Sequence, residues 1–300
     1  MSVDFNQLTP PKAVEELDFE TIFNERKEAL IALWPSNKQN QIRKTLERES
    51  EPLTKLLQEN VYREVLLRSK LNAQYRAVLL AYATGTDLDA KVADYGIQRL
   101  IISPEDLTTT PPTPAVYESD EDLRYRASKA FDALSVAGPT SAYEFHSLSA
   151  DGRVADAYAS SPAPSQALIT ILQRDSENGA ASPELCQKVY NYVSGEKLRP
   201  TADRVTVQSA GIIEYQIQAV LHHNNLPETD PVLEEAIANI NAFINSPKRI
   251  GQSIYLSAIF KQLHVSGVER VELISPPADV LVTAFEASFC NGVNVTIAEG

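Results

Sequence analysis

The sequence contains few of the residues on which catalytic and covalent sites depend. Its 300 residues include two cysteines, four histidines, eleven glycines and one tryptophan. The pair Cys186 and Cys290 cannot form the dense disulfide framework of a small secreted domain. Cys186 falls beside Leu185 and Val189 on the apolar stripe of an expected helix, which favours a buried, inert thiol over a nucleophile. We therefore expect neither a disulfide scaffold nor thiol chemistry.

Motifs for phosphate, dinucleotide, serine-hydrolase and zinc-protease chemistry are also absent. The chain holds no GxxxxGK[ST] loop, no GxGxxG turn, no GxSxG elbow and no HExxH pair. If the expected strand before His222 and His223 ran through them, their side chains would point to opposite faces and could not chelate one ion. The acidic cluster at 118–122 lacks the ligand spacing of an EF-hand and is better explained as a helix start. We predict no catalytic residue, no metal and no cofactor.

The formal net charge of −13 argues against binding to nucleic acid, because it repels phosphate backbones. The basic residues between 43 and 76 alternate with glutamates, which is typical of a solvated helical face of mixed charge. No run approaches the roughly 18 apolar residues that a membrane span requires. The opening residues, MSVDFN, have neither a basic nor an apolar signal region. We expect a chain that stays in the cytoplasm and does not insert into membranes.

The most informative segment is a long helical pattern over residues 52–83. At a rise of about 1.5 Å per residue this helix would be on the order of 45–50 Å long, which exceeds an ordinary single-core domain. Its apolar side chains fall on two faces, and this pattern favours packing from two directions. We therefore predict that the helix binds a partner chain. The candidate interface residues are Leu53, Leu57, Val61, Leu67, Leu71, Tyr75, Val78 and Tyr82 on one broad stripe, with Tyr62 and Leu66 nearly opposite.

The first half of the chain is expected to be helical, with one interruption. Region 1–102 includes an amphipathic run at 19–34 that can lie along the long helix, and a short helix at 87–95. Residues 103–117 are rich in proline and threonine and indicate an extended connector, a candidate articulation between rigid parts. Region 118–150 is expected to be a helical hairpin.

The hairpin should begin at Ser119, whose hydroxyl can cap a helix with acidic residues in its first turn. Gly138 and Pro139 should end the first helix of the hairpin, and Thr140 or Ser141 can cap a second short helix through Leu148. Its expected buried stripe is Leu123, Ala127, Ala130, Phe131 and Leu134.

The second half of the chain changes from helical to mixed periodicity. Region 151–210 shows strands at 154–159, 167–173 and 205–209, with a helix at 183–193. Region 211–300 shows an alternating strand at 212–221, helices at 231–244 and 256–263, a strand at 268–274 and a tail at 280–298. We expect the tail to form a hairpin with Gly292 in its turn. The predicted fold class is α+β: an N-terminal long-helix bundle, two small mixed strand-helix-strand modules and a C-terminal hairpin.

Short segments of the chain occur in an order that is specific when they are taken together. They are TGTDLD at 84–89 leading to DYGIQR at 94–99, ESDEDLRYR at 118–126, VADA at 154–157 before SPAP at 161–164, and LRPTADRV at 198–205. By these segments the chain resembles the baseplate J-like proteins of contractile-tailed bacteriophages and related particles. Family members often place glycine after the SPxP turn, where this chain has Ser165, so the departure concerns only that local turn.

The resemblance implies a structural role in the virion and no enzymatic activity. Family members are wedge components of the tail baseplate, set in a ring of six-fold symmetry around the central hub. It implies as partners other wedge proteins, copies of the same chain, and hub and sheath-initiating proteins, with assembly in the cytoplasm of the host bacterium. It also implies that the N-terminal helices join a partner's helices in a bundle and that rearrangement is relayed to the sheath.

Two alternatives to a structural virion component stay open at the level of sequence. One is a soluble enzyme with an uncommon carboxylate site near 118–122, which would need convergent carboxylates with displaced pKa values. The other is a transient assembly chaperone, which would be missing from the finished particle.

Overall fold

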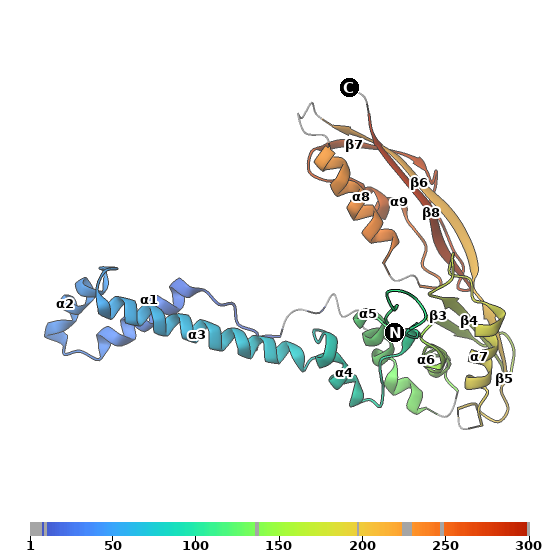
Figure 1. The fold of residues 1–300 in the computed structure, drawn as a ribbon, viewed down its shortest axis with the longest axis horizontal. Coiled ribbons are helices and arrows are strands. Elements are labelled where there is room, and N and C mark those ends of the chain that lie inside the picture. Colours follow the sequence, from blue (N-terminus) through green and yellow to red (C-terminus); the bar gives the residue numbers. More distant parts are fainter. Residues whose placement is uncertain are drawn as a thin grey trace. The chain divides into compact units, whose positions relative to one another are not determined.

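The protein folds into two compact units, Met1–Gly96 (unit 1) and Ile97–Gly300 (unit 2) (Figure 1). The structure, a computed structural model, describes residues 8, 11–135, 138–196, 198–223, 230–246 and 249–298. Unit 1 is helical in its described part, and unit 2 combines helices with three small sheets. The predicted α+β class is therefore confirmed.

Unit 1 is built from helices that begin at recognisable signals. The Asp18 side chain accepts a hydrogen bond from the Thr21 amide at 2.8 Å and caps the first helix. Pro35 precedes the second helix, and Pro52 occupies the first turn of the third, where its missing amide hydrogen costs little. Helix α1 contacts both α2 and α3. The elements are α1 (Phe19–Ala32), α2 (Ser36–Leu46), α3 (Pro52–Ala77) and α4 (Gly85–Ala93).

The long helix is shorter than the sequence predicts. Helix α3 ends at Ala77, so its 26 residues span about 39 Å, and Val78 and Tyr82 lie in the turns beyond it. The amide of Leu79 bonds to the Arg76 carbonyl three residues back, which tightens the chain into a turn and places Ala83 in the core. The turns after Ala77 and the burial of Ala83 thus replace the helix that the periodicity would have continued.

The expected extended connector at 103–117 is wrong, because this segment folds back on itself inside unit 2. Strands β1 (Ile101–Ser103) and β2 (Val116–Tyr117) pair antiparallel, and Asp106 and Thr113 bridge the loop between them. The Asp106 carboxylate accepts the Thr108 amide at 2.8 Å, a local turn that no periodicity signals. The boundary between the two compact units falls earlier in the chain, after Gly96.

Residues 97–210 form the central module of unit 2. Its sheet has the order β3-β4-β5, with β3 and β4 antiparallel and β4 and β5 parallel; helix α7 lies in the crossover. Ser165, in the turn before β4, has φ 59°, the left-handed conformation that suits the glycine expected there. The elements are α5 (Asp120–Ser128), a 3₁₀ helix η2 (Ala130–Leu134), α6 (Thr140–Ala150), β3 (Val154–Ser160), β4 (Gln166–Gln173), α7 (Pro183–Val193) and β5 (Arg204–Ser209).

At the start of the central module the predicted helix cap is confirmed, but the predicted buried stripe is only partly buried. The Ser119 hydroxyl accepts the Asp122 amide at 3.2 Å, and Leu123 is fully buried. Helix α5 ends at Ser128, however, and the tighter winding of η2 changes the direction of the later side chains. Phe131 and Leu134, which were expected to be buried, are therefore 67% and 77% exposed.

Residues 211–300 form the C-terminal module, in which α8 and α9 cover one face of a three-stranded sheet (Figure 1). The long central strand pairs antiparallel with β7 and parallel with β8. Its alternation is as predicted, because Tyr215, Ile217, Ala219 and Leu221 are all buried. The elements are β6 (Gly211–His223), α8 (Asp230–Ile244), α9 (Leu256–Leu263), β7 (Val268–Ser275) and β8 (Glu286–Ile297).

The expected C-terminal hairpin is wrong. Strand β8 is one continuous strand, and Gly292 lies at a bulge where the pairing with β6 shifts between Cys290 and Gly292. A glycine inside a β-branched run marks a bulge as readily as a turn, and here parallel pairing with β6 uses the whole run. In the sheet of the central module the middle strand is β4, the second of its three strands in chain order. In the sheet of the C-terminal module the middle strand is β6, the first of its three strands. The two modules therefore differ in strand connectivity.

Candidate functional site

The ten candidate interface residues differ widely in exposure. Val61 is completely buried, and Leu53, Leu57 and Tyr82 are half-buried. The other six expose 45–62% of their surface, which is unusual for large apolar side chains on one element. These six are Tyr62, Leu66, Leu67, Leu71, Tyr75 and Val78.

Several of the contacts between helix α3 and the rest of unit 1 are polar. Arg68 forms ion pairs with Glu64 and Glu15, and the Asn72 amide donates to the Glu15 carbonyl at 2.9 Å. Over its whole length α3 buries only Thr54 and Val61. Because a helix in a folded protein owes most of its stability to packing of an apolar face, α3 gains little of that stability from its own unit.

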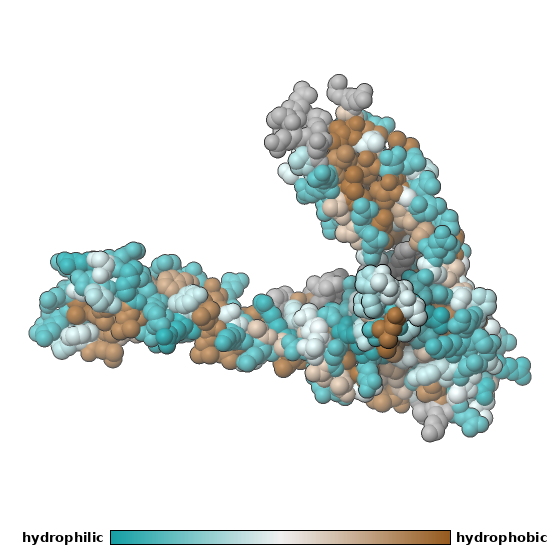
Figure 2. Space-filling view, in the orientation of Figure 1, coloured by the Kyte–Doolittle hydropathy of each residue, from teal (hydrophilic) through white to brown (hydrophobic). Residues whose placement is uncertain are grey.

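An apolar groove of about 550 Å³ runs between α1 and α3. Leu30 and Leu33 line it from the α1 side, and Leu57 and Leu67 from α3. Leu33 is 81% exposed, so the groove opens to solvent. On the face shown in Figure 2, apolar residues gather in patches along unit 1 between hydrophilic ones. An apolar, solvent-open lining of this kind is typical of grooves that bind the apolar face of an amphipathic helix.

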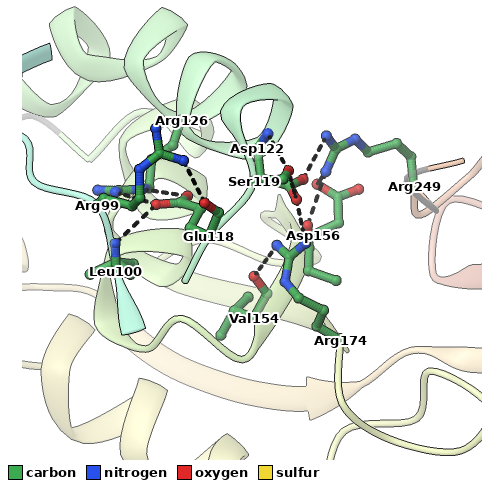
Figure 3. A network of polar contacts seen from close by, with 11 residues as sticks. Arg99, Leu100, Glu118, Ser119, Asp122, Arg126, Val154, Asp156, Arg174 and Arg249 are labelled. Atoms are coloured by element: carbon green, nitrogen blue, oxygen red, sulfur yellow. Dashed lines mark hydrogen bonds and ion pairs between the residues drawn. The ribbon is translucent and has the colours of Figure 1, made fainter. Parts of the chain in front are cut away.

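A second feature is a cluster of arginines and carboxylates where the two modules of unit 2 meet (Figure 3). Asp122, at the start of α5, and Asp156, on β3, are about 5% and 4% exposed. Arg174, which follows β4, pairs with Asp122. Arg249, from the C-terminal module, lies 3.4 Å from a carboxylate oxygen of Asp122 and 3.9 Å from one of Asp156.

The remaining contacts of Arg249 fix its side chain completely. Its Nη1 donates to the Ala155 carbonyl at 2.9 Å, and its guanidinium lies 3.9 Å from the centroid of the Tyr125 ring. The next amide, of Ile250, donates to Asp156 at 2.9 Å. Burial raises the pKa of the Asp156 carboxyl, and the Arg249 charge acts in the opposite direction. The cluster thus joins the two modules through ion pairs to two buried carboxylates.

The acidic cluster at 118–122 is explained by these ion pairs rather than by catalysis. Glu118 pairs with Arg126, Asp120 with Arg99 and Asp122 with Arg174. Arginine partners thus neutralise three of the four carboxylates of this cluster, and Glu121 is exposed. Within the described residues there is no group of three or more His, Cys, Asp or Glu placed to hold a metal. No described helix is long and apolar enough to cross a membrane.

The histidines and cysteines occupy ordinary positions. The strand does run through the histidine pair, and His222 faces Glu272 and Arg270 on neighbouring β7, while the side chain of His223 is outside the described residues. Cys186 and Cys290 are not joined in a disulfide, and burial raises the pKa of the Cys186 thiol.

Arg174 and Arg249 are the site residues that sequence reasoning missed. Neither belongs to a motif, and their meeting depends on contacts between segments far apart in the chain. The composition does single out Arg249, because region 211–300 has only two arginines and Arg249 lies just before the glycine at 251. A rare arginine in an acidic module is a candidate for a specific ion pair.

Two family models match the chain: the Baseplate J-like N-terminal domain over residues 49–106 and the Baseplate J-like central domain over residues 135–209. The apolar helix face and the neutralised carboxylates therefore belong to a structural phage protein, a class not known for enzymatic activity. Baseplate protein J of Escherichia phage P2 is 51% identical over 293 residues, which are 98% of this chain and 97% of that protein. The chain belongs to the baseplate J family and is a structural component of the phage tail baseplate.

A solved structure also shows a weak likeness. It is a chain of the cryo-EM structure of the anti-feeding prophage baseplate, symmetrised six-fold. The identity is 11% and the TM-score 0.41, with 60% of this chain and 44% of that chain covered. A TM-score this low defines no common fold.

Proposed function

We propose that the chain is a wedge component of a contractile-tail baseplate and that unit 1 is its main docking element. In this proposal copies of the chain stand in a six-fold ring around the hub, in contact with other wedge proteins, hub proteins and sheath-initiating proteins. The groove between α1 and α3 receives an amphipathic helix of another baseplate chain. The single observation that carries this is the set of exposed apolar side chains, on two faces of a helix that buries only Thr54 and Val61 within its own unit.

The geometry of the groove supports a helix as its occupant. Apolar side chains line its floor, and Arg26, Arg63 and Glu64 stand among the lining residues as a polar rim. A partner helix would cover Leu33 and Leu67, which are 81% and 60% exposed. Burial of such side chains stabilises a complex by about 25 cal/mol per Å², before association costs are subtracted.

The net charge of helices α1, α2 and α3 indicates which charged residues a partner helix carries. Residues 19–77 carry eleven Lys and Arg against eight Asp and Glu, while the whole chain has a net charge of −13. Helices α1, α2 and α3 are thus a basic region within an acidic protein. We infer that the partner helix carries acidic residues beside its apolar stripe, because complementary charge favours encounter and fixes orientation.

Relay of rearrangement to the sheath forms part of the same proposal. The chain would take up force at unit 1, where it is anchored, and pass it to the modules of unit 2, which bind neighbours. The division after Gly96 supports this, because it separates the docking helices from the modules at a single chain crossing.

Photo-crosslinking in purified tails tests the docking proposal. A photoreactive residue at Leu71, which is 45% exposed on α3, should crosslink to a helix of another baseplate chain. The matched control places the same residue at the exposed Ala202, in unit 2, where we expect no crosslink to that helix. Absence of any interchain product from Leu71 would contradict the proposal.

Particle composition separates a wedge component from a transient chaperone. A wedge component is present in purified tails in fixed ratio to the other baseplate proteins. A chain found during assembly and missing from finished particles would be a chaperone, and the wedge proposal would be wrong.

A further inference from the structure

The two modules of unit 2 meet through little apolar surface. Leu172 and Ala155 from the central module meet Ile212, Ile250 and Ala287 from the C-terminal module around the linking residue Ala210. Tyr158 and Phe285 add one edge-to-face ring contact with centroids 5.8 Å apart. Alanines make up much of this contact, so it offers few interlocking side chains to fix an angle between the modules. Each module has a separate and larger core of its own.

Arg249 is the charged bridge across this junction. It comes from the segment between α8 and α9, and its recorded partners Tyr125, Asp122, Asp156 and the Ala155 carbonyl all belong to the central module. Stacking of the flat guanidinium on the ring, together with its hydrogen bond to the Ala155 carbonyl, restricts the orientation of this side chain. These contacts, with the hydrogen bond from the Ile250 amide to Asp156, favour one angle between the modules.

A cleft of about 450 Å³ lies beside this bridge. Ser119, Asp122 and Arg174 line it from the central module, and Ile244, Asn245 and Ser246 from the end of α8. The two modules are therefore not in close packing contact along this cleft. A junction with open space on one side and one charged side chain bridging it can act as a hinge whose angle is held by that ion pair.

We propose that Arg249 is a latch that holds the two modules at one angle, and that its release lets the C-terminal module swing about residues 209–211 toward the cleft. Partial release is unfavourable, because Asp156 is 4% exposed and would remain buried without its guanidinium partner. Full opening admits water to Asp156 and removes that penalty. The junction therefore has two stable arrangements, latched and open, rather than a continuous range.

The test measures the distance between the modules in the isolated full-length chain, so it does not depend on the proposed docking of unit 1. Spin labels are placed by Asn191→Cys on α7 and Ala238→Cys on α8, both exposed positions, in a Cys186→Ser, Cys290→Ser background. Double electron–electron resonance should give one narrow distance distribution for native Arg249. Arg249→Ala should broaden this distribution and shift its mean.

Two further variants keep the result decisive. Arg270→Ala removes an arginine of the same module whose ion pair with Glu272 stays within β7, and it should leave the distribution narrow. Arg249→Lys keeps a cation near Asp156 but loses the planar stack, and it should give an intermediate width even if Arg249→Ala fails to fold. An unchanged narrow distribution in folded Arg249→Ala, or in Arg249→Lys if the alanine variant is unfolded, would overturn the proposal.

Discussion

Glu118 and Arg126 form an ion pair in which both side chains are almost completely buried, with 2.7 Å between Oε2 and Nη2. The pair is bidentate, because Arg126 Nε also donates to Oε1 at 3.1 Å. Arg126 further donates to the Gln98 carbonyl, and Glu118 accepts the Leu100 amide at 3.2 Å. The pair therefore ties the start of unit 2 to helix α5.

Removing one member of this pair should destabilise unit 2 strongly. Arg126→Ala leaves the Glu118 charge buried without a cation, and we expect a loss of about 3–5 kcal/mol in the free energy of unfolding. Urea denaturation measures the change. The control Arg270→Ala breaks an exposed pair with Glu272 and should cost less than about 1 kcal/mol. Equal losses in the two variants would contradict this account of the buried pair.

We predict that alanine at position 152 is destabilising, because there is no room for a Cβ atom there. A Cβ at this position would lie 2.4 Å from the Ile101 carbonyl oxygen, a backbone atom of β1. Gly152→Ala should push β1 away from the module and destabilise unit 2 by about 1–3 kcal/mol. Hydrogen exchange at the Glu118 amide, which bonds to the Leu100 carbonyl, reports the displacement.

The control for this prediction is Gly292→Ala, in strand β8. A Cβ at Gly292 would meet no atom within 4 Å, so exchange near β1 should stay unchanged. Native exchange at Glu118 in the Gly152→Ala variant would show that the close approach of β1 does not constrain the fold.

The Asp151 carboxylate should contribute stability that acid removes. Burial raises its pKa, but hydrogen bonds from Arg153 and Lys188 outweigh burial and lower it to about 2 from 3.8. The folded state binds this proton more weakly than the unfolded chain, so the contribution is full above pH 3.8 and is lost as pH falls through about 2. Urea unfolding of native protein and Asp151→Asn should differ near neutral pH and converge near pH 2. A difference that does not change with pH would contradict this assignment.

Much of the fold could be predicted from local pattern. Helix α7 has the predicted bounds, the buried face of β6 follows the predicted alternation, and Ser119 caps α5 as its position before three acidic residues indicates. In these segments the hydrophobic period, the cap and the tertiary burial agree. Local and global preferences then select the same structure.

The remaining elements depend on contacts between distant parts of the chain. The sequence alone cannot show that Asp106 pairs with Thr113, that β8 lies parallel to β6, or that α3 stops at Ala77 to bury Ala83. The candidate site divides in the same way. The exposed apolar residues of α3 follow from periodicity, whereas the cluster around Arg249 needs two modules to be folded and joined.

The docking role of α3 is tested most directly by size-exclusion chromatography with light scattering, on the chain alone and co-expressed with its neighbouring tail proteins. The account predicts a defined hetero-complex in which residues 52–77 are protected from proteolysis. Leu67→Asp combined with Leu71→Asp should abolish the complex, because both exposed side chains would place a charge in an apolar interface. The control is Gln187→Asp combined with Asn191→Asp, which makes the same charge change with the same spacing at exposed positions of α7, away from every candidate interface residue of α3, and it should preserve the complex. Protection of 52–77 in the isolated chain, with no complex formed by the native protein, would contradict the account.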